Sequence, residues 1–262
     1  MPASPVRVVA LHTIFAEAML VCGIVPVGTV VHGQAIPRHL KAELRDAVSV
    51  GQSSAPDFEA ILGLAPDLIL ATPTAQRDSY PLLQAIAPTV LLEEPGANWR
   101  EWLRAVGVMT GCQEQSDKAI AAYDKRALEI RERLQASHAG ETVLLLRVRD
   151  KHIRIYGGAR RSGPVLFHDL GLTPHSLVPM AENNLVISNE IIPQLTADHI
   201  FLMVEDQARM QGLRDTVLWN ALPAIRNGHV YEVDIEPWNQ SNGPISFRRI
   251  IEDVARNMLG DD

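Results

Sequence analysis

The stretch PDFEAILGLAPDLILA, from Pro56 to Ala71, is repeated in outline by SNEIIPQLTADHIFLM, from Ser188 to Met203. Each stretch carries a glutamate, then seven further residues, an aspartate and an apolar run. Such a run is typical of a strand that is buried on both faces of a parallel sheet. The repeat therefore predicts two similar α/β lobes in one chain. The alternative is chance, because helix–turn–strand units share this composition widely.

The two glutamates are Glu59 and Glu190, and each is predicted to lie on the exposed face of a short helix. Strands and helices alternate between Arg7 and Leu92, an order that favours a parallel, doubly wound sheet. Apolar residues recur at three- and four-residue steps before Ser137, which predicts a long helix.

The predicted fold class is α/β, with two doubly wound lobes that have mainly parallel sheets and are connected by a single long α-helix. An N-terminal α/β lobe is expected over residues 1–112 and a C-terminal α/β lobe over residues 139–262. The interlobe helix is expected over residues 113–138.

Composition narrows the class of protein. The chain has 262 residues, 47% hydrophobic and 21% charged, which are values of a globular protein with room for two cores. A net charge of −7 and the lack of a long basic run argue against nucleic acid as the main partner.

The start MPASPVRVVAL does not resemble an export signal, so we expect either a trimmed exported protein or a cytoplasmic one. Cys22 and Cys112, which lack CxxC spacing, are expected to be buried thiols.

A predicted hairpin, TVLLLRVRD followed by HIRIYGG, carries the most informative group of charges. Arg147 and Arg149 share one face of the first strand, and Arg154 and Tyr156 share one face of the second. A two-residue turn at Asp150–Lys151 places Arg147 opposite Arg154, a pairing that is unfavourable unless an anion lies there. The cluster predicts a site for carboxylate, catecholate or hydroxamate oxygens. The alternative is neutralisation by Asp150 or another acid.

Other candidate ligand contacts lie in loops that follow strands, where open α/β sheets bind their ligands. In the first lobe these residues are His12, Thr13, Ser53, Ser54, Thr72, Thr74, Gln76 and Tyr80. Near the C-terminus the segment EPWNQSNGP adds Asn239 and Trp238, and we expect the indole to be an exposed aromatic platform. The nine histidines form no short zinc motif, so no direct metal site is predicted. No nucleophile elbow, catalytic triad or phosphate loop is present, which argues against an enzyme with a catalytic cleft.

Four blocks in order carry a resemblance to a known family. They are RVVALHTIFAEAMLVCGIVPVGTV, APDLILATPT, LWNALPAIRNGHVYEV and WNQSNGPIS. Together they resemble the opening strand and helix, the cleft strand and loop, and two late blocks of the iron-siderophore-binding proteins of ABC importers. In this class, two α/β lobes are joined by one long helix.

The resemblance implies an extracytoplasmic substrate-binding protein that captures an Fe(III)-siderophore between two lobes and delivers it to an ABC transporter permease. It implies that Glu59 and Glu190 dock on the permease and that Arg147, Arg149 and Arg154 hold siderophore oxygens. A monomer is expected, at the periplasmic or extracellular membrane-anchored face. No catalysis and no cofactor are expected, with Fe(III) present only as part of the bound siderophore. The alternatives are a haem, cobalamin or metal binding protein of the same fold, and a cytoplasmic siderophore-sensing domain of a transcriptional regulator.

Overall fold

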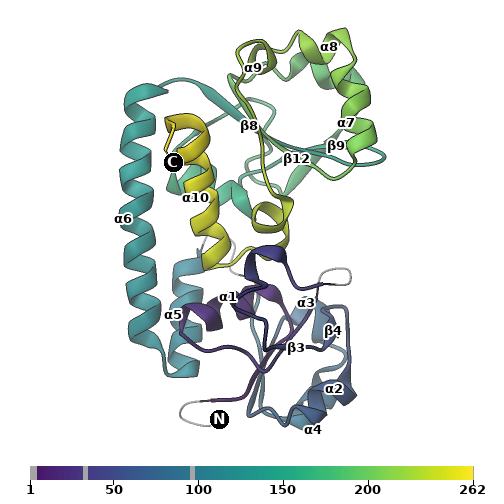
Figure 1. Ribbon diagram of the computed structural model, residues 1–262, viewed down its shortest axis with the longest axis vertical. Coiled ribbons are helices and arrows are strands. Elements are labelled where there is room, and N and C mark those ends of the chain that lie inside the picture. The colour runs from purple at the N-terminus through teal and green to yellow at the C-terminus, as the bar shows by residue number, and fades with distance from the viewer. Residues whose placement is uncertain (1–4, 32–34, 95–97, 262) are drawn as a thin grey trace. The chain divides into compact units, whose positions relative to one another are not determined.

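The computed structural model describes residues 5–31, 35–94 and 98–261 (Figure 1). The chain divides into two compact units, the first made of residues 1–123 and 240–247 and the second of residues 124–239 and 248–262. The division falls inside helix α6, Gln113–Ser137, so this helix begins in the first unit and ends in the second. Each unit contains its own sheet, which confirms the predicted α/β class.

The sheet of the first unit is parallel throughout, with the strand order β3-β2-β1-β6-β7. Strands β4 and β5 form a separate two-stranded antiparallel sheet. The strands are β1 Val8–Ala10, β2 Gly28–Thr29, β3 Val48–Ser49, β4 Gly51–Gln52, β5 Ala55–Pro56, β6 Leu68–Ala71 and β7 Thr89–Leu91.

Helices cover this sheet. Ile61 and Leu83, from α2 and α4, pack into one core cluster with the strand residues Val9 and Ile69. Burial of these side chains removes apolar surface from water, which is the main favourable term for the fold. The helices are α1 Thr13–Val21, η1 Arg38–Leu40, α2 Phe58–Gly63, α3 Pro73–Gln76, α4 Tyr80–Ile86 and α5 Trp99–Thr110.

A buried carboxylate holds the returning segment 240–247 in the first unit. Glu17, in α1, is fully buried and accepts hydrogen bonds from the backbone nitrogen of Ser246 at 2.8 Å and from its hydroxyl at 2.6 Å. His39 Nε2 lies 3.6 Å from the same carboxylate. At Gly243 a Cβ would lie 2.5 Å from Glu17 Oε2, so only glycine allows this approach.

The expectation of free buried thiols is wrong, because Cys22 and Cys112 form a disulfide. Their Cα atoms lie 5.4 Å apart although 90 positions separate them in the sequence. Cys22 ends α1, and Cys112 follows Gly111, whose left-handed backbone at φ 74° ends α5. Tertiary packing of the two helix ends therefore brings the sulfurs together.

The sheet of the second unit is mixed. Its strand order is β11-β9-β8-β12-β13, and β10 pairs with β8 outside this path. Strands β8, β12 and β13 are parallel, as is β10 to β8, whereas β9 and β11 are antiparallel to their neighbours. The strands are β8 Thr142–Val148, β9 Ile153–Tyr156, β10 Thr173–Pro174, β11 Asn184–Ile187, β12 His199–Val204 and β13 Val230–Glu232.

Short helices cover one face of this sheet, where Trp219 and Leu222 pack into a cluster with Leu144 and Ile200. The remaining helical segments are the π-helices η3 Pro164–Asp169 and η5 Glu236–Ser241, the 3-10 helix η4 Asn189–Gln194, and α7 Gln207–Arg214, α8 Val217–Asn220, α9 Pro223–Arg226 and α10 Pro244–Leu259.

The C-terminal half of α6 runs beside α10, and Figure 1 shows the two helices next to each other. Arg126 Nη2 pairs with Glu252 at 2.7 Å, and Arg133 Nη2 pairs with Asp261 at 2.6 Å. Hydrogen bonds from Arg133 lower the pKa of Asp261 to about 2. Within the described part of the chain, no helix combines the length and the apolar character needed to cross a membrane.

Candidate functional site

A polar pocket of about 300 Å³ lies at the carboxyl edge of the sheet in the first unit. The segments that line it follow β1, β2, β4, β6 and β7, so five parts of the chain meet at this edge. The lining residues are His12, Val31, Gln52, Ser53, Ser54, Thr72, Thr74, Ala75 and Glu94.

Local hydrogen bonds fix the loops of this pocket. His12 caps α1, since its Nδ1 accepts from the backbone nitrogen of Ile14 at 3.3 Å, and its Nε2 lies 4.0 Å from Glu94 Oε1. The Ser53 hydroxyl donates to the Leu11 carbonyl at 2.9 Å. These bonds leave the pocket lined by hydroxyl, amide, imidazole and carboxylate groups held on short loops.

Gln76 lies behind this pocket and does not line it. Its side chain is fully buried, accepts from the backbone nitrogen of Thr72 at 3.0 Å and donates to the carbonyl of Ser53. The amide thus ties the loop after β6 to the loop after β4. Thr13 is buried inside α1, and the Tyr80 hydroxyl on α4 faces the Thr89 carbonyl at 3.4 Å.

Five of the eight residues predicted in these loops therefore line one pocket: His12, Ser53, Ser54, Thr72 and Thr74. Their role in binding stays a prediction. Glu94 was missed, although an acid shortly after the end of a parallel strand is the signal that would have found it.

In the second unit, the predicted register of the hairpin is confirmed, with Arg147 directly opposite Arg154. The Arg147 side chain is 11% exposed and donates to Glu205 Oε2 from Nε at 2.9 Å and to the Tyr156 hydroxyl from Nη1 at 3.0 Å. Arg149 Nε donates to the same Glu205 oxygen at 2.8 Å. The acid that neutralises part of this cluster is therefore Glu205.

Glu205 is the first residue after β12, and its place in this cluster was not predicted. Arg154 Nε donates to His152 Nε2 at 2.9 Å, which requires an unprotonated nitrogen there. Desolvation and the nearby guanidiniums of Arg154 and Arg149 lower the pKa of His152 and favour this neutral form. The three arginines Arg147, Arg149 and Arg154 outnumber the two acids Glu205 and Asp150, so the net charge of this cluster stays positive.

The expectation that Trp238 is an exposed aromatic platform is wrong, because its side chain is fully buried. Its Nε1 donates to Asp253 Oδ2 at 2.8 Å, and its ring packs at 5.0 Å from the ring of Phe201. A buried partner for the indole N–H is what allows the whole side chain to leave water. Asn239 is also buried and accepts from Arg161 Nη1 through its side-chain oxygen at 3.2 Å.

The two glutamates of the repeated stretches are exposed, as predicted. Glu59 lies in the first turn of α2, which is capped by Asp57. Glu190 lies in the first turn of η4, which is a 3-10 helix. The exposure of these two glutamates does not test whether they dock on a permease.

One group of side chains has donor atoms close enough for a metal ion in the described residues: His138, Glu141 and His199, at the amino edge of the second sheet. Hydrogen bonding from His199 lowers the pKa of Glu141, and burial lowers the pKa of His199. The group lies at the opposite edge of the sheet from Arg147 and Arg149, since it precedes β8 and begins β12.

Comparison with known proteins gives a family match. The sequence pattern of the family described as periplasmic binding protein matches residues 8–237, which is most of the chain. The probable siderophore-binding lipoprotein YfiY of Bacillus subtilis (strain 168) is 29% identical over 274 residues, covering 98% of this chain and 84% of that protein. The achromobactin-binding periplasmic protein of Dickeya dadantii (strain 3937) is 28% identical, covering 96% of this chain and 86% of that protein.

A solved structure has the same fold. The crystal structure of Staphylococcus aureus SirA complexed with staphyloferrin B superposes with a TM-score of 0.86 at 26% identity, covering 99% of this chain and 94% of that chain. The resemblance found in four blocks of sequence is thereby confirmed along nearly the whole chain.

Proposed function

The chain belongs to the periplasmic binding protein family, and from this premise we propose that it is the substrate-binding protein of an ABC importer for an Fe(III)-siderophore. The observation that carries the proposal is the arginine cluster of the β8–β9 hairpin. Three guanidiniums at one sheet edge suit a ligand that presents several anionic oxygens. Relatives named for siderophores, and a similar structure with bound staphyloferrin B, support the same ligand class.

The hairpin holds its guanidiniums in place before a ligand arrives. Arg147 is fixed by Glu205 on one side and by the Tyr156 hydroxyl on the other, while Arg149 shares the same carboxylate oxygen. A side chain that is already ordered loses less rotamer entropy on binding. The positive charge of the cluster therefore favours anionic ferric siderophores, of the carboxylate or catecholate type, over neutral hydroxamate complexes.

The pocket around His12 is the corresponding candidate surface in the first unit. Its hydroxyl and amide groups donate and accept without adding net positive charge, which suits ligand hydroxyls and carbonyls. Ser53 and Thr72 belong to loops that the buried Gln76 side chain ties together. Such fixed polar groups select a ligand by orientation more than by affinity.

The proposed place of action is extracytoplasmic. The Cys22–Cys112 disulfide is typical of an oxidising compartment. The exposed carboxylates Glu59 and Glu190 would meet cationic groups of the permease, so the ligand is handed on without a chemical step. We expect the chain to act as a monomer that carries no cofactor of its own.

The test is a binding panel read by intrinsic tryptophan fluorescence. Ferric siderophores of carboxylate, hydroxamate and catecholate type are titrated into the protein, with haem and cobalamin as controls. Submicromolar binding of at least one ferric siderophore is expected, with anionic carboxylate or catecholate complexes bound more tightly than neutral hydroxamates. Binding of haem or cobalamin alone, or of none of these compounds, would overturn the proposal.

A further inference from the structure

The amino edge of the sheet in the second unit gathers three side chains that the proposed function does not use. His138 follows the last turn of α6, Glu141 directly precedes β8, and His199 is the first residue of β12. Strand β12 lies beside β8 in parallel register, with His199 next to Val143. This pairing brings His199 to the short segment that carries the other two residues.

The three side chains meet at one oxygen atom. Glu141 Oε2 lies 2.7 Å from His138 Nδ1 and 2.6 Å from His199 Nε2. One ligand atom from each residue lies within 4.8 Å of the other two. The imidazole rings stand edge to face with centroids 5.1 Å apart.

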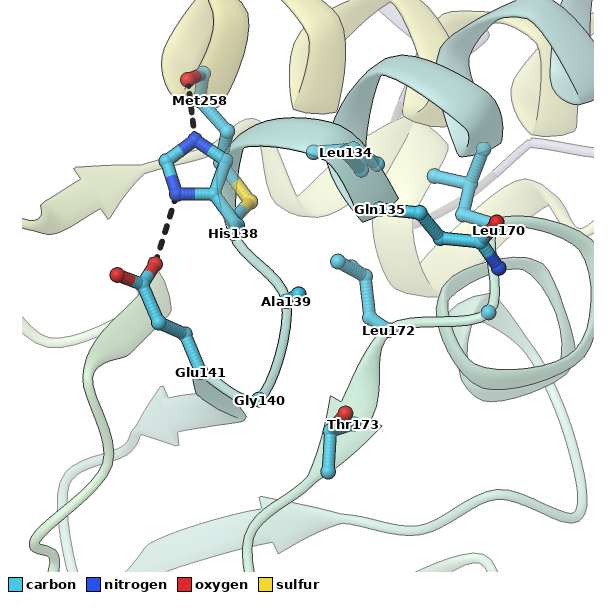
Figure 2. A pocket seen from close by; sticks show the side chains of 11 residues that line it. Leu134, Gln135, His138, Ala139, Gly140, Glu141, Leu170, Leu172, Thr173 and Met258 are labelled. Carbon is cyan, nitrogen blue, oxygen red and sulfur yellow. Dashed lines mark hydrogen bonds and ion pairs between the residues drawn. The ribbon is translucent and has the colours of Figure 1, made fainter.

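The outer nitrogen of each imidazole is also engaged. His138 Nε2 lies 2.9 Å from the carbonyl oxygen of Met258, and Figure 2 shows the ring held between this carbonyl and Glu141. His199 Nδ1 lies 3.1 Å from the Tyr231 hydroxyl. Histidines that bind metals almost always have such an outer partner, which fixes the tautomer and the ring orientation.

We propose that His138, Glu141 and His199 form a binding site for a divalent transition metal ion, with Zn²⁺ as the best match. Two imidazoles and one carboxylate are an established ligand set for zinc in proteins. Both imidazoles are held by outer partners, and the single carboxylate would offset part of the charge of the ion. The site is separate from the arginine hairpin and does not depend on the proposed siderophore function.

Zinc coordination requires Glu141 Oε2 to move away from both imidazole nitrogens, which lie 2.7 and 2.6 Å from it. Tetrahedral zinc with bonds of about 2.0 to 2.1 Å places its ligand atoms roughly 3.3 Å apart. The Glu141 side chain is 39% exposed and is free to retreat by the required fraction of an ångström, whereas His199, at 1% exposed, stays in place. His138 and Glu141 also line a pocket of about 240 Å³ (Figure 2), whereas His199 is not among its lining residues.

The bound ion would join three segments that are distant in sequence: the end of α6, the start of β8 and the start of β12. Its expected role is therefore structural. A ligand that binds the folded state and not the unfolded state raises the free energy of unfolding. Zinc should stabilise the protein without changing the affinity for a ferric siderophore.

The experiment uses the full chain freed of metal by a chelator and then dialysed. Zn²⁺ is titrated by calorimetry and by competition with a chromophoric chelator, and thermal unfolding is followed with and without the ion. The wild type is expected to bind one equivalent and to unfold at a higher temperature. His138→Ala and Glu141→Gln are each expected to weaken binding by more than about tenfold.

His168→Ala is the matched control, because His168 is an exposed histidine of the same unit in η3. This variant should bind Zn²⁺ as the wild type does. Glu141→Gln keeps the shape of the side chain, so it tests the site even if His138→Ala fails to fold. Absence of zinc binding by the wild type at micromolar concentration, or equal binding by Glu141→Gln and the control, would overturn the proposal.

Discussion

Asp198 and Thr142 are joined by hydrogen bonds in both directions. The Asp198 carboxylate accepts from the backbone nitrogen of Thr142 at 2.7 Å and from its hydroxyl at 2.9 Å, while the Asp198 backbone nitrogen donates to the Thr142 carbonyl at 3.0 Å. In the first unit, the Asp67 carboxylate likewise accepts from the backbone nitrogen of Arg7 at 3.0 Å, and the Asp67 backbone nitrogen donates to the Arg7 carbonyl at 3.0 Å. The aspartate of each repeated stretch therefore holds two neighbouring parallel strands together where they begin.

We expect Asp198→Asn to lower the free energy of unfolding at pH 7 by about 2 kcal/mol, because hydrogen bonds to a charged acceptor contribute roughly 1.5 to 3 kcal/mol. Hydrogen bonds from Thr142 lower the pKa of Asp198 in the folded state. The folded pKa thus lies below the unfolded value of about 3.9, so the stabilisation is complete above that pH and is lost as the pH falls through the folded pKa. Urea unfolding of both proteins from pH 7 to pH 3 measures this difference.

Asp215→Asn serves as the control for that series, since Asp215 is an exposed acid of the same unit. Its stability should follow the wild type across the whole pH range. A difference between wild type and Asp198→Asn that stays constant down to pH 3 would show that the carboxylate charge contributes nothing.

Arg147→Ala should reduce the affinity for a ferric siderophore by about ten- to a hundredfold, the value of one charge-assisted contact. The fold should be kept, because Arg149 still pairs with Glu205 and the like-charge pair with Arg154 is relieved. Fluorescence titration gives the affinity, and thermal unfolding gives the stability.

Arg214→Ala is the matched control for the hairpin variant. Arg214 pairs with Glu232 at 3.1 Å on the surface of the same unit and is 45% exposed. Its removal should leave siderophore affinity unchanged. Equal affinities for Arg147→Ala and this control would move the ligand away from the hairpin.

The double variant Glu59→Ala with Glu190→Ala should bind a ferric siderophore normally but fail to stimulate ATP hydrolysis by the reconstituted transporter. Each carboxylate is exposed in its own unit, and exposed charge pairs contribute modestly one at a time, so both are removed. A matched double variant, Glu43→Ala with Glu132→Ala, removes one exposed glutamate from each unit. Normal stimulation by the first double variant would refute the docking role.

Reduction of the Cys22–Cys112 disulfide should lower the unfolding temperature. The bond closes a loop across a sequence separation of 90, for which the loss of unfolded-state entropy is worth about 4 to 5 kcal/mol in the chain-entropy model. Thermal unfolding with and without reductant, and of Cys22→Ser with Cys112→Ser, measures the effect. Thiol titration of the unreduced, denatured protein should find no free thiol, and two free thiols would contradict the bond.

Local features of the sequence were enough to predict the α/β class. The repeated stretches predicted two similar units because a glutamate, an aspartate and an apolar run keep their spacing when a helix–turn–strand unit is repeated. A two-residue turn fixes which residues face each other in a hairpin, so the pairing of Arg147 with Arg154 followed from counting. Loops such as those of Ser53 and Thr72 were found because parallel strands direct their carboxyl ends to one edge.

The remaining features depend on contacts between residues that are far apart in sequence. Trp238 became buried because Phe201 and Asp253 supply its packing surface and its hydrogen-bond acceptor. Cys22 met Cys112 only when two helix ends packed together, and His199 met Glu141 only when β12 paired with β8. Periodicity and turn length act over a few residues, so the sequence by itself determined the repeated helix–strand units, the long helix and the hairpin. Which side chains share a buried site was decided by the register of strands and the packing of helices in the tertiary structure.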